Sequence, residues 1–373
     1  MKDDFKDILL LGGGKIGAMI AELLSNSGNY GGDNDYRVTI GDISEDALKK
    51  VERNDRLDVL KLDVTKPAAL KQALAGKFAV LSAVPFSLTQ DVADGAVAAG
   101  VHYFDLTEDV ETTKHVIGLD RAGGPVMMPQ CGLAPGFISI AGAHLAKGFD
   151  ELEEVRLRVG ALTQFPTNGF KYNLTWSTAG LIHEYLQPCE AIVDGVKCTI
   201  RPLEDREVFS FDGTDYEAFN TSGGLGTLRD RLPARNLNYK TVRYPGHCEI
   251  LKLLIRDLKL GKDPERLVEM FDRALPIAYQ DVVLIFVTVI GRIGGELRQE
   301  SYANKIYSRV DAGRRWSAIQ ITTASAICAV LDMVRDGSLP QHGLIHHDQV
   351  DFDKFLENRF GKNFALTPGR GST

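Results

Sequence analysis

The sequence predicts an α/β protein in which a doubly wound parallel sheet precedes an α+β domain with a mainly antiparallel sheet. The first observation is that short apolar runs alternate with helical periodicity over the first third of the chain. The second is that this alternation stops after Gly136, where longer β-rich runs begin. The N-terminal strands are predicted at residues 7–11, 37–41, 57–62, 78–83, 101–105 and 125–128, with helices at 15–27, 44–52, 67–75, 89–99 and 111–122.

Three glycines separate the first predicted strand from the first predicted helix, at the spacing G-x-G-x-x-G. Gly12 permits a tight turn, Gly14 lets the backbone approach a pyrophosphate, and Gly17 lets the helix lie close on the sheet. The amides at the helix N-terminus then face the anion. Asp42 follows the second predicted strand, where a carboxylate meets the adenosine ribose. These features predict a Rossmann dinucleotide-binding domain, and a glycine-rich turn without a ligand is the alternative.

Asp42 favours NAD over NADP, because the 2′-phosphate of NADP would bring a second negative charge against its carboxylate. Glu45 and Asp46 add to that repulsion, and Lys49 is the nearest cation along the following segment. The expected cofactor is therefore NAD. The residues predicted to bind it are Gly12, Gly14, Lys15, Ile16, Gly17, Asp42, Asp63, Val64, Ala83 and Pro85.

The second domain is predicted from its β-rich runs and its short helices. Strands are expected at 154–161, 170–176, 190–200, 205–213, 281–291 and 296–308, and helices near 137–147, 178–185, 222–231, 247–259 and 264–272. Residues 281–308 are predicted to form a hairpin that turns at 291–295. Residues 317–336 form an apolar helix, and the tail from residue 364 is expected to fray. The predicted domains are 1–132, 133–315 and 316–373, the last packing back on the first.

The composition narrows the function classes. A net charge of −7 over 373 residues gives no electrostatic footprint for nucleic acid or an anionic membrane. The N-terminus is acidic and polar, unlike a secretory signal, and the apolar runs are too interrupted to span a bilayer. Five cysteines form no C-x-x-C pair, so reduced thiols and a cytoplasmic location are expected. No metal site is predicted, because the adjacent His346 and His347 share no ligand face and are expected at the surface.

Four motifs carry a resemblance to a known family. They are Gln-Cys-Gly-Leu-Ala-Pro-Gly, which ends at Gly136, the segment 171–188, Glu-Ala-Phe-Asn-Thr-Ser-Gly-Gly-Leu from Glu217, and Lys-Thr-Val-Arg-Tyr-Pro-Gly-His-Cys-Glu from Lys240. In this order they resemble the saccharopine dehydrogenase-like oxidoreductases, most closely the lysine 6-dehydrogenase branch. The resemblance implies an NAD-dependent enzyme that oxidises the amine of an amino acid through an imine. It also implies a homodimer formed largely by the second domain.

Two departures from the family pattern bear on the substrate. Ala134 stands where saccharopine reductases carry an aspartate that contacts their substrate, which favours a smaller substrate such as L-lysine. Residues 160–169 lack the Gly-Gly-Leu-Pro run that is usual in the lysine enzymes. Saccharopine dehydrogenase is therefore an alternative, and so is a non-catalytic NAD-binding protein.

Three residues in or beside these motifs are candidates for the base that takes the amine proton. Asp105 lies at the carboxyl end of the fifth predicted strand, where open α/β sheets bind ligands. His247 has an ordinary pKa in the useful range, and Glu108 is the third candidate. A loop-capping carboxylate and a helix-capping imidazole are the structural alternatives for Asp105 and His247. The sequence does not choose between catalysis and these roles.

The resemblance also implies substrate contacts. Arg243 lies in a segment similar to one whose arginine binds the substrate α-carboxylate in saccharopine reductases, and its planar fork suits a carboxylate. A surface ion pair is the alternative for this residue. Trp176 is expected to line the aliphatic part of a lysine-like substrate, or else to be an ordinary core residue. Thr175 and Tyr244, which neighbour these residues in the same motifs, complete the predicted substrate site.

Overall fold

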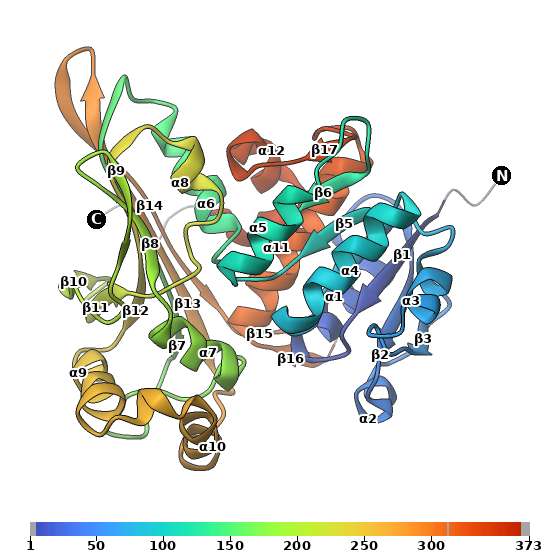
Figure 1. The fold of residues 1–373 in the computed structure, drawn as a ribbon, viewed down its shortest axis with the longest axis horizontal. Coiled ribbons are helices and arrows are strands. Elements are labelled where there is room, and N and C mark those ends of the chain that lie inside the picture. Colours follow the sequence, from blue (N-terminus) through green and yellow to red (C-terminus); the bar gives the residue numbers. More distant parts are fainter. Residues whose placement is uncertain (1–4, 312, 367–373) are drawn as a thin grey trace. The chain divides into compact units, whose positions relative to one another are not determined.

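The computed structural model describes residues 5–311 and 313–366, and the chain forms two compact units. Unit 1 comprises Met1–Phe137 with Gln320–Thr373, and unit 2 comprises Ile138–Ile319. The boundaries expected from the sequence lie at 132/133 and 315/316. Each unit contains its own large sheet, so the two are described separately (Figure 1).

Unit 1 is built on a seven-stranded sheet. Its strands are β1 (Lys6–Leu11), β2 (Tyr36–Asp42), β3 (Leu57–Lys61), β4 (Ala79–Ser82), β5 (His102–Asp105), β6 (Val126–Met128) and β17 (Gly343–Leu344). They lie in the order β17-β6-β5-β4-β1-β2-β3, and every pair is parallel. The six predicted strands are present and β17 adds a seventh, which confirms the doubly wound parallel sheet.

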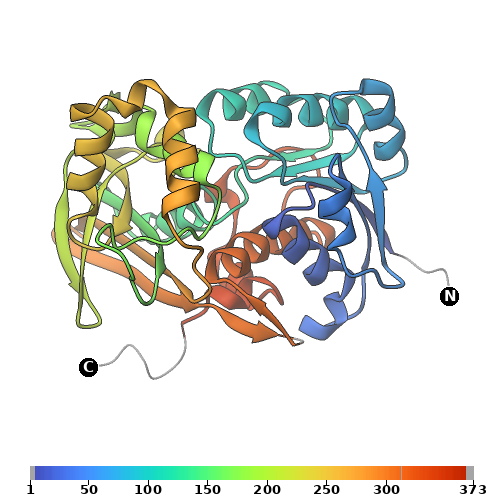
Figure 2. The ribbon, with the colours of Figure 1, turned by 90° about the horizontal axis from the view of Figure 1, so that it is seen from below.

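Helices cover both faces of this sheet. They include α1 (Lys15–Ser25), α2 (Glu45–Lys49), α3 (Pro67–Leu74), α4 (Phe86–Ala99) and α5 (Val110–Gly118). Helices α3, α4 and α5 pack side by side on one face, where their apolar residues join a cluster with Leu9, Val80 and Tyr103 of the strands (Figure 2). Gly100 ends α4 in the left-handed conformation, at φ 68°, which glycine adopts without steric cost.

Buried polar contacts tie the C-terminal segment into unit 1. This segment contains α11 (Ala318–Arg335) and α12 (Phe352–Glu357). Asp332 of α11 accepts hydrogen bonds from the Tyr36 hydroxyl and from Arg359, each at 2.7 Å. Phe364 is fully buried and stacks on Phe137 with ring centroids 3.9 Å apart, so the predicted fraying does not begin there. Residues 367–373, which the same prediction covers, lie outside the described residues.

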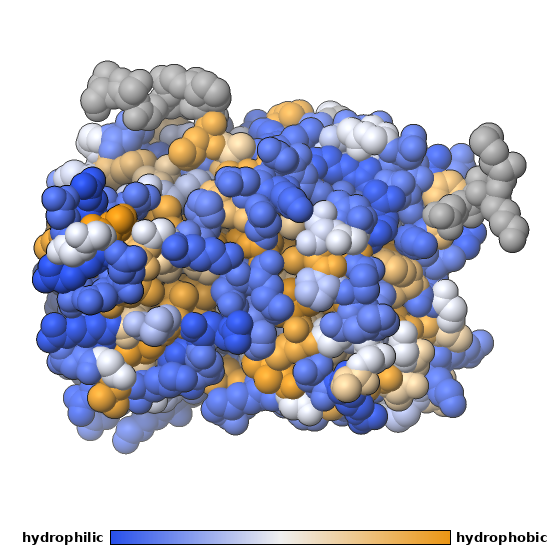
Figure 3. Space-filling model, turned by 90° about the horizontal axis from the view of Figure 1, so that it is seen from above, coloured by the Kyte–Doolittle hydropathy of each residue, from blue (hydrophilic) through white to orange (hydrophobic). Residues whose placement is uncertain are grey.

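Helix α11 is the one helix in the described part of the chain that is long and apolar enough to cross a membrane by length and composition. Within the structure, 78% of this 18-residue helix is buried. A helix at the core of a folded unit meets the same criteria. Hydrophilic residues cover most of the molecular face in Figure 3.

Unit 2 holds an eight-stranded sheet. Its strands are β7 (Glu151–Thr163), β8 (Cys189–Val193), β9 (Val196–Ile200), β10 (Glu207–Phe211), β11 (Thr214–Asn220), β12 (Ala234–Arg243), β13 (Asp281–Ile293) and β14 (Glu296–Tyr307). The main order is β10-β11-β12-β7-β13-β14, and β8 joins β12 and β9. Every pair is antiparallel except β12 with β7, as the mainly antiparallel prediction expects. The predicted hairpin is confirmed, since β13 and β14 join through Gly294 and Gly295.

Further helices and a small two-stranded ribbon belong mostly to unit 2. They are α6 (Phe137–Ala146), α7 (Thr178–Leu186), α8 (Leu228–Arg231), α9 (His247–Lys252), α10 (Pro264–Ala274), and the ribbon of β15 (Arg309–Asp311) with β16 (Arg314–Trp316). Helices α7, α9 and α10 pack on one face of the unit 2 sheet, around Phe219, Leu251 and Phe271. This face therefore carries the larger apolar core of the unit.

The opposite face of the unit 2 sheet is concave. Phe209 of β10 and Phe286 of β13 have ring centroids 5.5 Å apart, although β11, β12 and β7 separate their strands. Lys305 of β14 donates a hydrogen bond to Asp212, just after β10, at 3.1 Å. The sheet therefore curls until its two ends approach each other, and the concave face encloses a second apolar cluster around Val242 and Leu284.

Several predictions for unit 2 are wrong in detail. The single strand predicted at 190–200 is a hairpin of β8 and β9. Residues 170–176 form no strand but a single bridge from Leu174 to Ile277, because Lys171 adopts a left-handed conformation. The predicted helix 222–231 shrinks to α8, since Gly223 and Gly226 take positive φ angles. Strands β11 and β12 were not predicted. In β12, polar residues alternate with Leu237 and Tyr239, which is a strand pattern that the prediction overlooked.

Candidate functional site

The glycine loop after β1 has the geometry of a phosphate cradle. Gly12 lies at φ 101°, and a Cβ there would stand 2.5 Å from the carbonyl oxygen of Ala83. A Cβ on Gly17 would stand 1.9 Å from the carbonyl oxygen of Gly12. A Cβ on Gly14 would meet no atom within 4 Å. Gly12 and Gly17 are therefore required by the fold itself, whereas Gly14 borders open space at the N-cap of α1, where a pyrophosphate would lie.

Asp42 ends β2 beside this loop. Its Oδ2 accepts a hydrogen bond from the Gly13 amide at 2.6 Å, and its Oδ1 accepts one from the Ser44 amide at 2.7 Å. Each carboxylate oxygen retains a lone pair, so both remain available to ribose hydroxyls. The prediction that Lys49 is the nearest cation overlooked the neighbouring strand. Lys61 is the register partner of Asp42 on β3, and its ammonium pairs with Glu45 at 2.5 Å.

The remaining predicted cofactor residues lie along the same edge of the sheet. Asp63 and Val64 follow β3, Ala83 and Pro85 follow β4, and Lys15 and Ile16 open α1. The Asp63 carboxylate accepts hydrogen bonds from the amide and hydroxyl of Thr65, which lower its pKa. The Ala83 amide donates to the Leu11 carbonyl, which fixes the crossing between β4 and the glycine loop.

Asp105 ends β5 and is fully buried. Its carboxylate accepts hydrogen bonds from the Tyr103 hydroxyl at 2.7 Å and from the amides of Thr107 and Gln130 at 2.9 and 2.8 Å. Burial raises the pKa of Asp105 to about 6 despite these three donors. The carboxylate therefore joins the end of β5 to the loop after β6, as a loop-capping residue does.

His347 corrects the prediction of two surface histidines. Its side chain is buried, and its Nε2 donates to the Gln130 carbonyl at 2.9 Å. Burial lowers the pKa of His347 to about 4, so the imidazole is neutral at physiological pH. Gln130, which also donates to Asp105, is held at φ 63°, a left-handed conformation that costs energy for a side chain of this size.

Arg243 ends β12 and lies at the centre of a buried cluster in unit 2. The guanidinium is 2% exposed and donates hydrogen bonds to Glu184 Oε1, the Tyr185 hydroxyl and the Val242 carbonyl, each at 2.9 Å. It also lies over the Tyr172 ring, 5.1 Å from the centroid. Burial raises the pKa of Glu184 to about 7, although Arg243 acts in the opposite direction. The surface ion pair considered for Arg243 is therefore a buried one.

His247 extends this cluster. Its Nδ1 lies 3.1 Å from the Phe170 carbonyl, which only accepts, so Nδ1 carries the proton and Nε2 accepts from the Tyr185 hydroxyl at 3.2 Å. Tyr185 in turn accepts from Arg243. Burial lowers the pKa of His247 well below its usual value, with the Arg243 charge acting in the same direction. The imidazole is thus neutral and forms part of a directed hydrogen-bond chain.

Glu217 of β11 fixes the turn that carries His247. Its fully buried carboxylate accepts hydrogen bonds from the amides of Gly246 at 3.1 Å and Cys248 at 2.7 Å. Gly246 supplies the left-handed N-cap of α9, at φ 101°. The two motifs that begin at Glu217 and Lys240 therefore meet at this point of the structure.

The other predicted substrate residues border the Arg243 cluster. Thr175 is buried, and Trp176 is partly buried against the apolar core beneath α7 and α10. The Tyr244 hydroxyl donates to the Thr163 carbonyl at 2.9 Å. Glu108, in unit 1, is partly buried beyond Asp105. Glu184 and Tyr185 were not among the predicted site residues, and the signal for Glu184 was a carboxylate within the apolar stretch Leu-Ile-His-Glu-Tyr-Leu of α7.

The fold and the glycine cradle define a two-unit protein with a dinucleotide-binding domain. Comparison with protein families then gives the family. Residues 8–120 match the saccharopine dehydrogenase NADP binding domain, and residues 132–362 match the saccharopine dehydrogenase C-terminal domain. The chain belongs to the saccharopine dehydrogenase family, as the sequence motifs indicated. These matches indicate a nicotinamide dinucleotide cofactor without separating NAD from NADP.

A relative and two solved structures are similar to this chain. Saccharopine dehydrogenase [NADP(+), L-glutamate-forming] of Saccharomyces cerevisiae is 23% identical over 301 residues. The match covers 74% of this chain but only 63% of the length of the yeast protein. The apo structure of the yeast L-Glu-forming enzyme has a TM-score of 0.74 at 16% identity and covers 96% of both chains. Homospermidine synthase from Legionella pneumophila with NAD has a TM-score of 0.62 at 13% identity. The match covers 99% of this chain and 93% of that one. At these identities the structures show a shared fold alone.

Proposed function

We propose that this protein is a nicotinamide-dinucleotide-dependent oxidoreductase that acts on the amine of an amino acid, with L-lysine as the first candidate substrate. The observation that carries this proposal is the match to both domains of one dehydrogenase family, over residues 8–120 and 132–362. The open space at Gly14 and the carboxylate of Asp42 support dinucleotide binding.

A bound nicotinamide dinucleotide would supply the hydride acceptor for the carbon that bears the amine. The substrate ammonium must first lose a proton, because its nitrogen then has the lone pair that forms the imine. A free lysine ammonium has a pKa of about 10.4, so a base must accept that proton at neutral pH. Water then adds to the imine and ammonia leaves, which gives an aldehyde.

We assign the substrate carboxylate to Arg243, whose guanidinium is oriented by Glu184 and Tyr185. Burial raises the pKa of Glu184 to about 7, but its Oε1 lies 2.9 Å from the Arg243 guanidinium, so Glu184 belongs to the carboxylate end of the proposed substrate and not to its ω-amine. Asp105 and His247 are the candidates for the base that takes the amine proton, since Arg243 and Glu184 share the burial and the internal hydrogen bonds of these two residues.

The test of the substrate is a panel of amino acids with NAD, followed by the absorbance of NADH. We expect turnover of L-lysine or a close ω-amino analogue and none of saccharopine, because Ala134 offers no carboxylate to the larger molecule. Turnover of saccharopine with inert L-lysine would establish the second candidate, saccharopine dehydrogenase, which the yeast relative favours. Dinucleotide binding without turnover of any substrate would identify a non-catalytic protein.

We propose that NAD is preferred over NADP, through Asp42. A 2′-phosphate would be in contact with this carboxylate, and two like charges about 4 Å apart at an effective dielectric near 20 repel by about 4 kcal/mol. The adjacent Lys61 is already paired with Glu45. Because solvent screens part of this repulsion, we expect NAD to bind roughly a hundredfold more tightly in titration calorimetry, and Asp42→Ala to narrow that gap. Equal affinity of the wild-type protein for both dinucleotides would refute the assignment.

We also propose a cytoplasmic homodimer. Among the described residues the long strand β14 forms a strand ladder with β13 alone, and we propose that a second copy pairs along its outer edge. All five cysteines are unbridged, as expected in a reducing compartment. Analytical ultracentrifugation at micromolar concentration is expected to show a dimer, and a monomer would contradict this proposal.

A further inference from the structure

Strand β14 forms an edge of the unit 2 sheet, and its first half is exposed. Residues 296–301 are exposed at every position, whereas Tyr302 is 6% exposed. Beyond Tyr302 the curl of the sheet brings β14 towards the end of β10, where Lys305 donates a hydrogen bond to Asp212. Figure 1 shows the turn between β13 and β14, in orange, at the margin of unit 2. The accessible part of this edge is therefore the segment 296–301.

The turn determines which backbone groups of this segment point outward. Gly294 and Gly295 have φ angles of 59° and 84°, and the pair Ile293–Glu296 closes this two-residue turn. The closing pair of such a hairpin is hydrogen-bonded, and hydrogen-bonded pairs alternate with non-hydrogen-bonded pairs along the ladder. Even-numbered residues of β14 therefore bond to β13, and the amides and carbonyls of residues 297, 299 and 301 point outward. Outward groups of this kind are a template for another strand.

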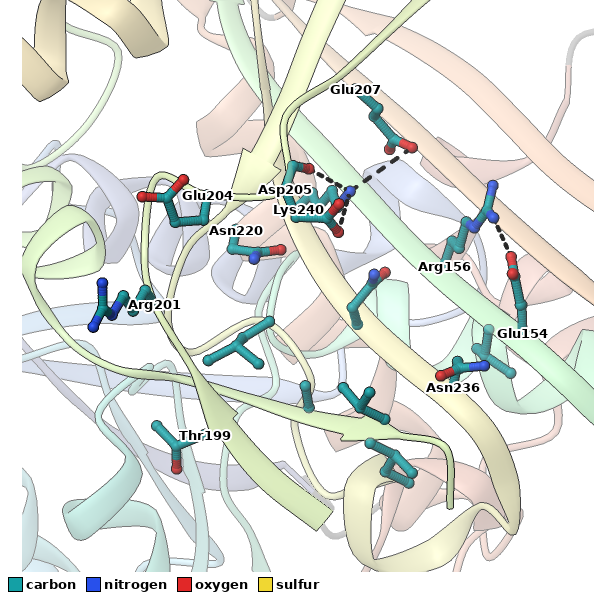
Figure 4. Close-up of a pocket in the computed structure, with 16 residues that line it drawn as sticks. Glu154, Arg156, Thr199, Arg201, Glu204, Asp205, Glu207, Asn220, Asn236 and Lys240 are labelled. Carbon is teal, nitrogen blue, oxygen red and sulfur yellow. Dashed lines mark hydrogen bonds and ion pairs between the residues drawn. The ribbon is translucent and has the colours of Figure 1, made fainter. Parts of the chain in front are cut away.

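The side chains of the segment carry a charge pattern that its own chain does not complete. Charged residues on the inner strands of the sheet find partners within the chain, as Lys240 does with Asp205 (Figure 4). Arg298 pairs with Glu296 at 2.8 Å, on the same face of the strand. Glu300, the next residue on that face, is exposed and makes no ion pair with any residue that the structure describes. A strand with a cation opposite Glu300 would therefore complement this edge.

Charge complementarity selects the register in which a second copy of β14 can pair with the first. Directly opposite residues of an antiparallel ladder lie on the same face, so the two-fold axis of two identical strands passes through one residue. An axis at Arg298 or at Glu300 brings like charges together, because that residue then lies opposite its own copy. An axis at Gln299 instead places Arg298 opposite the partner's Glu300, and symmetry repeats this pair. An axis at Leu297 also pairs opposite charges, but it places the turn of the hairpin within the ladder.

We propose that a second copy of this chain pairs its β14 with this one, antiparallel and about a two-fold axis at Gln299. The proposal rests on the homodimer of the proposed function, whose interface it assigns. The outward backbone groups of residues 297–301 then form hydrogen-bonded pairs with those of the second copy. Arg298 and the partner's Glu300 form the intervening pair, whose Cα atoms lie about 4.5 Å apart, close enough for the side chains to touch. The sheets of the two copies are continuous through this segment.

The register is tested by a disulfide at the two-fold axis. In Gln299→Cys the two new thiols belong to a hydrogen-bonded pair with Cα atoms about 5.5 Å apart, which suits a disulfide. In Leu297→Cys the two thiols lie about 14 Å apart, because four residues separate them along the ladder. Both variants carry Cys198→Ser, which removes the one natural cysteine that is not buried. We expect mild oxidation to give a covalent dimer of Gln299→Cys and none of Leu297→Cys, on a non-reducing gel.

The ion pairs are tested by charge reversal. Arg298→Glu places a glutamate opposite the partner's Glu300 in both copies, so we expect Kd of the dimer to rise at least tenfold in analytical ultracentrifugation. Combining Arg298→Glu with Glu300→Arg restores opposite charges, and we expect it to restore the dimer. Arg273→Glu makes the same change of charge at an 80% exposed side chain on α10, and we expect it to leave Kd unchanged. Thermal unfolding of each variant checks that the fold is retained.

The outcomes separate this interface from the homodimer itself. A wild-type dimer with no cross-link in Gln299→Cys and an unchanged Kd in Arg298→Glu would overturn the interface and leave the homodimer standing. A cross-link through Leu297→Cys instead of Gln299→Cys would overturn the register at Gln299. A monomeric wild-type protein at micromolar concentration would refute the homodimer and the interface together. The proposed oxidation is judged by turnover alone, whichever of these results is obtained.

Discussion

Replacing the buried Arg243 guanidinium is expected to destabilise the protein by about 3–5 kcal/mol, the usual cost of removing one member of a buried ion pair. Arg243→Met keeps much of the side-chain volume but leaves Glu184, which is 7% exposed, without its cation. The Tyr185 hydroxyl also loses its donor. Chemical denaturation of the variant and the wild-type protein measures this difference.

The loss of stability in Arg243→Met should depend on pH. The folded-state pKa of Glu184 is already raised from 4.5 to about 7, and removal of Arg243 raises it further. A carboxyl group whose pKa is higher in the folded than in the unfolded state binds more protons in the folded state. Its contribution to the free energy of unfolding therefore falls as the pH rises through the folded-state pKa. The deficit of Arg243→Met should therefore be larger at about pH 8 than at about pH 5.

The matched control is the double variant Arg243→Met with Glu184→Leu. An apolar pair often replaces a buried ion pair at little cost, so the double variant should be more stable than Arg243→Met alone. Additive losses would show that the two side chains do not interact. Where the single variant retains its fold, an increased KM for the amino acid with unchanged dinucleotide affinity tests the proposed contact with the substrate carboxylate.

The parallel sheet of unit 1 could be predicted because its local signals agree. Each strand is a short apolar run, and the helices between them have their own periodicity. Strand β12 could not be found in this way. Its concave face carries Asn236, Asn238 and Lys240, whose burial depends on how the sheet curls, and that curl joins residues far apart in sequence such as Phe209 and Phe286.

The site was predictable in part for a similar reason. The spacing of Gly12, Gly14 and Gly17 follows from local backbone geometry, and Arg243 lies in the motif that begins at Lys240. The partners of Arg243 depend on how α7 packs against β12, which no spacing encodes. The buried state of His347 likewise depends on the approach of the C-terminal segment to the loop after β6.

Two of the loop glycines are expected to respond in opposite ways. Gly14→Ala should leave the unliganded fold intact, because Gly14 has a negative φ of −70° and a Cβ there meets no atom within 4 Å. The same methyl group occupies the space of a pyrophosphate, so dinucleotide affinity should fall by about 1–3 kcal/mol, roughly ten- to hundredfold. Thermal unfolding and titration calorimetry with NAD measure the two effects.

Gly17→Ala should instead damage the fold itself, since its Cβ would stand 1.9 Å from the carbonyl oxygen of Gly12, a backbone atom that cannot turn away as a side chain does. Gly118→Ala, at the end of α5 with open space around it, is the control that should alter neither stability nor binding appreciably. If Gly14→Ala bound NAD as tightly as the wild-type protein, the dinucleotide would not approach the backbone at this loop. A folded Gly17→Ala with full affinity would mean that α1 does not need its close contact with the sheet.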